Sequence, residues 1–362
     1  MKITLKNTPE QVELVKAMAS RNRDVAYEAQ TALAEFIGPV LAEVINNAPV
    51  LSNLFTTLQY NSDDSPSIPL DLYFDVSDED YVQVYSQSRA GGLPTSEVLP
   101  TSAELKIATY SLDSAVSFDR RYAAKSRLDV VAKTMTRVAQ EILLKQNTIS
   151  ANVIMKALAE ASTNGLAHVI AAQTADRFTL ADLNALSTRS KRIITSFVGG
   201  TADARQGRGM TDIIVSPEIV EELRAIAYNP INTKAAPGAA ANSNVQTANV
   251  IAEEAYRAAG APEFYGINVI ELNEFGDGQK FNAIYGSYAG GFTPASDQIV
   301  VGIDRSRESL IRPVAVDSEN GSEFSLIADD QYSIRQNKIG YFGGLEEGRV
   351  VLDNRALVGV VV

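Results

Sequence analysis

The side chains best suited to catalysis are few in this sequence and stand apart from one another. His168 is the only histidine, and it lies in the apolar segment Leu166-Ala-His-Val-Ile170. A single imidazole between apolar neighbours is more often structural than catalytic or metal-binding. The chain has no cysteine, which excludes disulfides, thiolate metal sites and a cysteine nucleophile. No G-x-S-x-G motif is present, so a hydrolase triad has no support.

Carboxylates and glycines offer two further kinds of site. Four acids could supply oxygen ligands to calcium: Asp75, Asp78, Glu79 and Asp80. They lack the glycine and the distal glutamate of the familiar calcium loop, which favours an acidic hairpin turn. Gly207-Arg-Gly209 and Gly276-Asp-Gly278 do not continue into a phosphate-binding motif and are interpreted as turns. The sequence therefore assigns no catalytic, cofactor-binding or metal-binding residue.

An enzyme of another kind stays open as the alternative class. A glycosidase needs only two carboxylates, and 44 acidic residues cannot exclude such a carboxylate-dependent hydrolase. However, tryptophan is absent and aromatic residues make up 7%, so no aromatic-rich cleft is indicated. A hydrolase would be a compact monomer or small oligomer with one deep pocket. We therefore expect a protein that is not an enzyme.

Composition limits the remaining classes. The 362 residues carry a formal charge of −12, which argues against nucleic-acid binding over the whole surface, although a local basic face remains open. The first residues lack the apolar core of a signal peptide, and the apolar run 356–362 is far shorter than the ~20 residues of a membrane span. We expect a soluble protein of two or three domains, made in the cytoplasm, with no membrane partner.

The first half of the chain predicts helices and a ribbon rather than a compact domain. Thr8-Pro9-Glu10-Gln11 is typical of a helix start, and a helical pattern runs from about 9 to 47, with a break expected near Gly38-Pro39. Because this arm is too narrow to enclose a core, we expect it to be buried against neighbouring subunits. Apolar residues then alternate in period two over 68–76, and further strands are expected at 81–85 and 104–111. Such a ribbon is only marginally stable alone and needs a partner.

The second half predicts a long helix followed by an α/β pattern. No glycine or proline occurs from Thr101 to Asn164, and helical spacing predicts one helix over about 124–162. The remaining elements are expected as follows: a helix at 179–196, a strand at 211–216, a helix at 217–227, a loop at 229–247, a helix at 248–259, a strand at 267–272, strands after Asn282, and two apolar strands within 348–362.

Charge is distributed unevenly along the chain. No Lys or Arg occurs from Asp24 through Ser88, a stretch that holds eleven acids. In the rest of the chain, 32 basic and 33 acidic residues nearly cancel. The following segment, 120–137, is basic, with six cations against Asp129. Two readings remain: two solvated faces, or an acidic projection that complements a basic helix start.

The order of these parts resembles the major capsid proteins of tailed phages, the HK-ninety-seven fold. The resemblance rests on these segments: 104–117 as the returning strand of the extended loop, 124–162 as the spine helix, 211–218 with Leu223 as the axial strand–helix unit, and 340–342 with 351–358 as returning strands. It implies an α+β fold with these parts: an N-terminal arm at 1–60, an extended β-ribbon loop at 61–115, a peripheral domain with the spine helix at 116–178, an axial domain at 179–312, and return strands of the peripheral domain at 313–362.

The resemblance also implies a function. A subunit of this family closes into hexamers and pentamers of an icosahedral shell, the virion capsid, around double-stranded DNA that it encloses without sequence-specific binding. Portal, scaffold and decoration proteins are candidate further partners. The short arm predicts no maturation cleavage. An encapsulin-like bacterial shell protein is the nearest alternative, whereas a bacterial surface or tail-tube protein would be richer in strands.

A specific contact between subunits follows from the charge pattern. We expect the acidic ribbon of one subunit to dock on the basic start of the long helix, 120–137, in a neighbour. The expected interface residues are the acids Asp78, Glu79 and Asp80, the apolar residues Ile68, Leu70, Leu72 and Phe74, and the cations Arg120, Arg121, Lys125 and Arg127. A ring in which each subunit gives and receives one ribbon closes by symmetry.

Overall fold

The computed structural model describes residues 8–47, 51–62, 64–69, 104–125, 128–163, 165–193, 209–228, 263–264, 266–316, 323–329 and 337–362. The chain divides into two compact units. Unit 1 comprises Met1–Ser150 with Ile311–Val350, and unit 2 comprises Ala151–Leu310 with Val351–Val362. Helices and strands occur in both units, which confirms the α+β class. None of the helices in the described residues is long and apolar enough to cross a bilayer.

Unit 1 begins with two helices, α1 (Pro9–Met18) and α2 (Arg23–Asn47). The expected start is confirmed, because the Thr8 hydroxyl accepts a hydrogen bond from the Gln11 N–H at 3.4 Å. The break expected at Gly38-Pro39 is wrong, since α2 continues through Pro39. The chain breaks instead at residues 19–22, where the Asn22 side chain accepts from the Asp24 N–H at 3.3 Å and caps α2.

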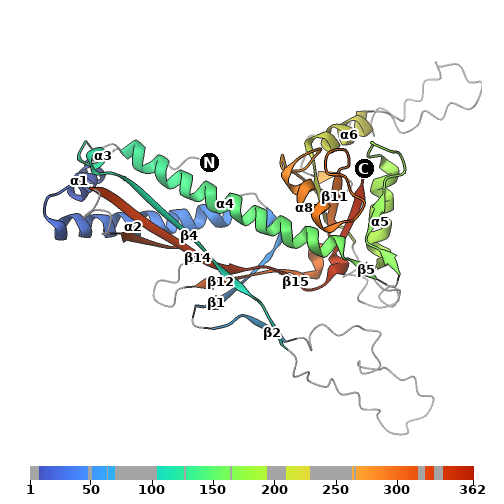
Figure 1. Ribbon diagram of the computed structural model, residues 1–362, viewed down its shortest axis with the longest axis horizontal. Coiled ribbons are helices and arrows are strands. Elements are labelled where there is room, and N and C mark those ends of the chain that lie inside the picture. The colour runs from blue at the N-terminus through green and yellow to red at the C-terminus, as the bar shows by residue number, and fades with distance from the viewer. Residues whose placement is uncertain are drawn as a thin grey trace, which may run out of the picture. The chain divides into compact units, whose positions relative to one another are not determined.

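The sheet of unit 1 is built around two long paired strands, β4 (Thr109–Asp119) and β14 (Lys338–Gly348) (Figure 1). It has six strands in all, the others being β1 (Thr56–Asn61), β12 (Leu310–Val316), β13 (Ser325–Asp329) and β15 (Val350–Val351). The path runs β1-β12-β14-β13, with β4 also pairing with β14. β1 and β12 are parallel, whereas β14 is antiparallel to β4, β12 and β13.

The core of unit 1 lies between this sheet and three helices. Alternate residues of β14, Ile339, Tyr341 and Leu345, are buried in it, as period two requires. The helix side is supplied by α1, α2 and the long helix α4 (Leu128–Ala159), which has 32 residues and confirms the long helix expected from the sequence. The arm helices thus pack into the core of their own chain, so the expectation that the arm must be buried against neighbouring subunits is wrong for this face.

The long helix is shorter at its start than expected. Residues 120–124 form a separate short helix, α3 (Arg120–Ala124), whose N-terminus is capped by Asp119. The Asp119 carboxylate accepts from the Arg121 N–H at 2.9 Å, which favours a new helix start at this point. Residues 151–159 of α4 belong to unit 2, and the preceding part belongs to unit 1.

Unit 2 contains a second six-stranded sheet in the order β7-β16-β11-β8-β10-β9. Its strands are β7 (Val169–Ala171), β8 (Asp212–Val215), β9 (Glu263–Phe264), β10 (Ile267–Glu271), β11 (Ile299–Ile303) and β16 (Leu357–Val361). All five residues of β11 are buried, as a strand covered on both faces requires. A two-stranded ladder, β5 (Ser162–Thr163) with β6 (Leu166–Ala167), precedes β7.

The helices of unit 2 follow the expected pattern with one exception. α5 (Leu180–Ile193) and α6 (Pro217–Tyr228) lie where the sequence predicts them, as do β8 and β10. The strands expected after Asn282 begin only at β11, because residues 280–288 first form a helix that was not expected, α8 (Lys280–Tyr288). Phe281, Asn282 and Tyr285 are buried on one side of it, which is helical spacing.

The end of the chain is divided between the units. Both expected strands exist, β15 and β16, separated by the 3-10 turn η6 (Asn354–Ala356). Residues 351–362 belong to unit 2, where β16 pairs with β7 and β11, so only 311–350 return to unit 1. The strand expected at 81–85, the loop at 229–247 and the helix at 248–259 lie outside the described residues.

Candidate assembly interface and its buried anchor

The root of the predicted ribbon is a short antiparallel ladder. β2 (Ser67–Pro69) pairs with β3 (Glu104–Lys106), with Ile68 opposite Leu105. The Ile107 N–H also donates to the Pro66 carbonyl at 3.0 Å. Thus the two chain segments that lead into and out of residues 70–103 are already paired.

The root lies against the end of β14 at a glycine. A Cβ atom placed on Gly348 would lie 2.8 Å from the Ala108 carbonyl oxygen and 3.2 Å from the Ile107 side chain. Such contacts are shorter than a side chain tolerates, so the close approach requires glycine here. The ribbon root is therefore held directly against the sheet of unit 1.

Next to this contact lies a group of hydrogen-bonded polar and charged side chains, which we call the anchor: Tyr110, Gln146, Arg312, Glu347 and Arg349. The Glu347 side chain is fully buried and accepts four hydrogen bonds. Arg312 Nε donates to Oε2 at 2.7 Å and Arg349 Nη2 donates to Oε1 at 2.9 Å. The Tyr110 hydroxyl donates at 2.9 Å and the Gln146 amide at 3.1 Å.

Electrostatics keep this carboxylate ionised. Burial alone would raise the pKa of Glu347, but the guanidinium groups of Arg349 and Arg312 outweigh burial and lower it. Burial and the charge of Glu347 together raise the pKa of Tyr110, so its hydroxyl stays protonated and donates. The Arg349 guanidinium carbon also lies 5.5 Å from the centre of the Phe55 ring, which is a favourable cation–π distance.

The anchor joins the elements on both sides of the ribbon. Tyr110 begins β4 just after the root, and Arg349 Nη2 donates to Ser52 at 3.0 Å, just before β1. The Leu51 N–H donates to Asn147 of α4 at 3.0 Å and adds a further tie to that helix. The chain leaving the ribbon, the sheet and the long helix therefore meet at the Glu347 carboxylate, and the chain before β1 joins them through Arg349.

The expected interface residues fall into three groups. Ile68 lies in the root and is only 7% exposed within its own chain, so it has little surface left for a neighbour. Arg120, Arg121 and Lys125 lie at α3. Outside the described residues lie Leu70, Leu72, Phe74, Asp78, Glu79, Asp80 and Arg127, together with Asp75 of the alternative calcium site.

α3 presents cations and an aromatic ring on its surface. Ala123 is fully buried and fixes the short helix on the core of unit 1. The Arg121 side chain is 81% exposed, with its Nε 3.7 Å from the Asp119 carboxylate. Tyr122 is 47% exposed and Lys125 is exposed, whereas Arg120 is half-buried. Arg121 and Lys125 are thus the cations best placed to meet an acidic partner.

Sequence reasoning missed an exposed apolar row on the sheet of unit 1. Phe342 of β14 stands opposite Ile327 of β13 and Ala115 of β4 in register. Phe342 is 40% exposed and Ile327 is 55% exposed, on the face opposite the core. The sequence carried a signal for this row: Phe342 is an aromatic residue at a position between Tyr341 and Leu345 where period two predicts a solvent-facing, polar side chain.

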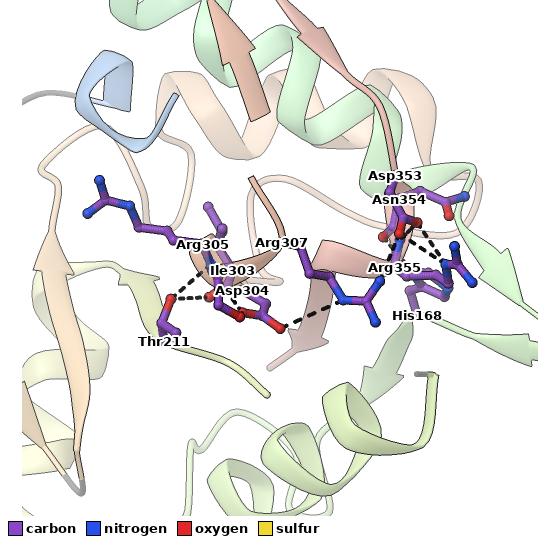
Figure 2. A network of polar contacts seen from close by, with 10 residues as sticks. His168, Thr211, Ile303, Asp304, Arg305, Arg307, Asp353, Asn354 and Arg355 are labelled. Carbon is purple, nitrogen blue, oxygen red and sulfur yellow. Dashed lines mark hydrogen bonds and ion pairs between the residues drawn. The ribbon is translucent and has the colours of Figure 1, made fainter. Parts of the chain in front are cut away.

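In unit 2 a polar network holds two turns in place (Figure 2). Arg307 Nη1 lies 2.8 Å from the Asp353 carboxylate, and Arg355 Nε lies 2.9 Å from the same group. Figure 2 shows Arg307 between Asp304 and Asp353. The side chains of Asp304 and Asp353 cap the 3-10 turns η5 (Arg305–Arg307) and η6. These charges fix backbone geometry.

His168 belongs to the same network and is structural, as expected. It is fully buried, and its Nδ1 lies 3.1 Å from the Asn354 carbonyl and 3.0 Å from the Leu357 carbonyl. Because carbonyl oxygens only accept, Nδ1 carries a proton. Burial lowers the pKa of His168, which keeps the imidazole neutral at pH 7.

An open cavity of about 420 Å³ in unit 2 is lined mainly by acids, namely Asp176, Glu218, Glu221, Glu222 and Asp277, with Arg177 among them. The Glu222 carboxylate accepts from the Phe178 N–H at 2.6 Å. Gly276 has φ +120°, as a turn residue, and its position lies against Glu218. Among the described residues no group of acids or histidine has an arrangement that could hold a metal ion.

Comparisons with known proteins give matches among solved structures. No protein-family model matches the sequence. No curated protein matches it either. The structure is similar to a virus-like particle from Pyrococcus furiosus, with a TM-score of 0.45 and 12% identity over 90% of this chain and 98% of that chain.

Two further similar structures have the same TM-score of 0.45. The holo-SrpI encapsulin complex from Synechococcus elongatus PCC 7942 shares 12% identity over 86% of this chain and 85% of that chain. The capsid of the cyanophage P-SCSP1u shares 14% identity over 86% of this chain and 88% of that chain.

The anchor generates a prediction about stability. Glu347→Ala leaves two buried guanidinium groups without their carboxylate and is expected to lower the free energy of unfolding by about 3–5 kcal/mol. Urea unfolding measures the change. The matched control is Glu346→Ala, because Glu346 is half-buried and bonded only to the Tyr60 hydroxyl among the contacts described here, at 3.2 Å. Equal losses in the two variants would contradict the anchor.

His168 generates a prediction about pH. The pKa of its imidazole is lowered in the folded state, so the unfolded chain takes up a proton first as the pH falls below about 6.5. The free energy of unfolding should therefore fall between about pH 7 and 5.5, by at most about 1.4 kcal/mol per pH unit. His168 is the only histidine, so His168→Gln should flatten this dependence in urea titrations. An unchanged slope in the variant would show that another group is responsible.

Proposed function

We propose that this chain is the major capsid subunit of a tailed phage, with the HK-ninety-seven fold, and that it assembles into an icosahedral shell around double-stranded DNA. The observation that carries the proposal is the ribbon root with its anchor. A two-stranded root leaves unit 1 at a point where one buried carboxylate binds the sheet, the long helix and Tyr110, which follows the second root segment. This construction gives a projecting ribbon a rigid base.

The surface of unit 1 favours assembly over a monomeric state. The sheet has apolar side chains on both faces: one face is the core, and the other exposes Phe342 and Ile327. Obligate interfaces between subunits bury roughly 2,000–5,000 Å² and are rich in apolar residues. An exposed aromatic–aliphatic pair on a sheet face is suited to such an interface.

The finer contact proposed is between the acidic ribbon of one subunit and α3 of the next. Asp78, Glu79 and Asp80 would face Arg121 and Lys125, which are exposed on α3. Exposed pairs are worth only about 0–1 kcal/mol each, so the charges would set register and speed encounter rather than supply affinity. Apolar burial would supply the affinity.

An encapsulin-like shell is the nearest alternative, and the contents of the particles separate the two. A phage capsid loaded in its host holds nuclease-protected duplex DNA, whereas an encapsulin holds protein cargo. Portal, scaffold and decoration proteins are proposed as further partners of the capsid, which would lie in the virion after synthesis in the host cytoplasm.

A hydrolase is the second candidate function, and the acidic cavity of unit 2 is the observation that favours it. Two carboxylates at a suitable separation are the machinery of a glycosidase. Glycoside turnover that is lost in Glu218→Gln would support this candidate. A monomer with such activity would displace the capsid proposal.

The capsid proposal predicts particles. Protein purified at micromolar concentration should form closed shells or capsomers, measured by light scattering and negative-stain microscopy. Deletion of residues 70–103, joined by a short Gly-Ser linker, should leave a subunit that unfolds cooperatively but does not assemble, because the root and the anchor remain. A monodisperse monomer of the intact chain at several salt concentrations would refute the proposal.

The proposed ribbon contact predicts the effect of charge reversal. Changing Asp78, Glu79 and Asp80 to Lys should slow assembly in low salt, because like charges then meet at α3. Adding Arg121→Glu and Lys125→Glu should restore part of the rate, as measured by light scattering.

The matched control for this reversal changes three exposed acids of unit 2 to Lys: Glu160, Glu271 and Glu308. It alters the net charge equally and should leave the rate closer to that of the unchanged protein. If the ribbon reversal assembles at the normal rate, the acidic turn faces solvent and the proposed contact is wrong.

A further inference from the structure

One side of the exposed surface of α2 is apolar, which is unusual for a helix on a surface. Val25 is 42% exposed, Phe36 is 55% exposed and Val40 is 42% exposed, and the exposed Ala32 lies between them. At 100° per residue these four positions fall within one narrow stripe about 22 Å long. We call this stripe the α2 crest. An exposed helix face normally carries polar side chains, so the crest indicates a contact that the isolated chain does not make.

The crest is held on the surface by the packing of the adjacent, inward side of α2. Leu33, Ile37 and Leu41 are at most 3% exposed and belong to the core of unit 1. A Cβ on Gly38 would lie 3.9 Å from Leu326 of β13, which indicates close packing of the helix on the sheet. Because α2 cannot rotate without opening this core, its apolar stripe stays on the surface.

The exposed charged side chains of α2 after Arg23 are all acidic, and most of them lie along one side of the crest. Asp24, Glu28, Glu35 and Glu43 are exposed on α2, and the helix has no Lys or Arg after Arg23. Two α2 helices packed together would bring these carboxylates against one another, which is unfavourable. The charge pattern therefore selects a partner surface that combines cations with apolar side chains.

The outward face of α4 in unit 1 has this combination. Lys133 and Arg137 are exposed along it, and Glu141 and Lys145 are exposed to one side of it. Leu144 is 46% exposed beside Lys145. Residues 133, 137 and 144 lie within about 40° of one another around the helix, so they share one stripe. α2 and α4 are labelled in Figure 1, in blue and green.

We propose that the α2 crest of one copy of this chain packs against the outward stripe of α4 in a second copy. Phe36 and Val40 would lie over Leu144, and Glu28 and Glu35 would face Arg137 and Lys145. The contact joins two different surfaces, so each copy gives one and receives one, and rotation symmetry closes the ring. This proposal deepens the proposed function, on which it rests, and is separate from the contact of α3 with the ribbon.

The first experiment removes the apolar crest. Phe36→Ser with Val40→Ser should raise the subunit concentration at half-assembly by at least about ten-fold, because two exposed apolar side chains no longer become buried. The midpoint of thermal unfolding of the unassembled subunit should stay unchanged, since both residues are exposed. The matched control is Leu166→Ser with Tyr288→Ser, two side chains of unit 2 that are 40% and 41% exposed.

The second experiment reverses the charges on each side. Glu28→Lys with Glu35→Lys should weaken assembly, and so should Arg137→Glu with Lys145→Glu. The four changes together should recover at least half of the lost assembly, which a merely structural role for these residues would not produce.

The outcomes separate this inference from the proposed function. If the unchanged protein does not assemble, the proposed function fails. If it assembles, and the crest variant assembles as well as the control, the α2 contact is wrong. Charge reversals that weaken assembly without mutual rescue would overturn the pairing of α2 with α4. The variant Arg137→Glu with Lys145→Glu could also assemble normally and lose only its retention of duplex DNA. That result would assign the α4 stripe to DNA binding and would overturn the pairing of α2 with α4.

Discussion

The buried carboxylate of Glu347 is the constraint on which the rest of unit 1 depends. It accepts hydrogen bonds from two guanidinium groups, a phenol and an amide, which come from β12, β4, α4 and the junction between β14 and β15. Buried ion pairs contribute little net stability compared with apolar packing, but loss of one partner is costly. The arrangement therefore specifies geometry: β4, β12, β14 and α4 must keep their relative positions for the charges to remain paired. Tyr110 and the close contact at Gly348 fix the position of the ribbon root relative to these elements.

Unit 2 also contains buried polar groups, but they lie at different places in its fold. Its sheet has buried central strands, and the buried carboxylates of Asp182 and Asp212 accept hydrogen bonds from uncharged groups. Its paired charges lie at the turns η5 and η6. Asp304 and Asp353 cap these turns and pair with arginines, while His168 donates to two carbonyl groups. The polar groups of unit 2 thus define where strands end, whereas those of unit 1 define how strands and helix meet.

The sequence predicted local elements well and distant contacts poorly. Helices α5 and α6 and strands β8 and β10 were found because period and start residues agree over each segment. The break before α2 was missed because Gly38-Pro39 is a stronger local signal than Asn22, yet packing of Ile37 and Leu41 holds the helix straight through the core.

The anchor could not be predicted from the sequence. Its bonded pairs are as far apart in the chain as Tyr110 and Glu347, separated by 237 residues, so no local pattern links them. Within the candidate interface, the basic segment at α3 could be predicted from the distribution of charge along the sequence alone. The apolar crest of α2 did not, because a helical pattern shows which residues are apolar but not which of two apolar faces the core will take.

The position of His168 has a consequence for how the surface responds to its surroundings. Histidine is the side chain whose ordinary pKa lies between pH 5 and 8, and the single histidine of this chain is fully buried. The side-chain charges on the described faces come from Asp, Glu, Lys and Arg, residue types whose ordinary pKa values lie outside that range. Ionic strength, through the Debye length of about 8–10 Å at ordinary salt, is then the variable that tunes encounters between copies, and mild acid acts on the interior of unit 2 instead.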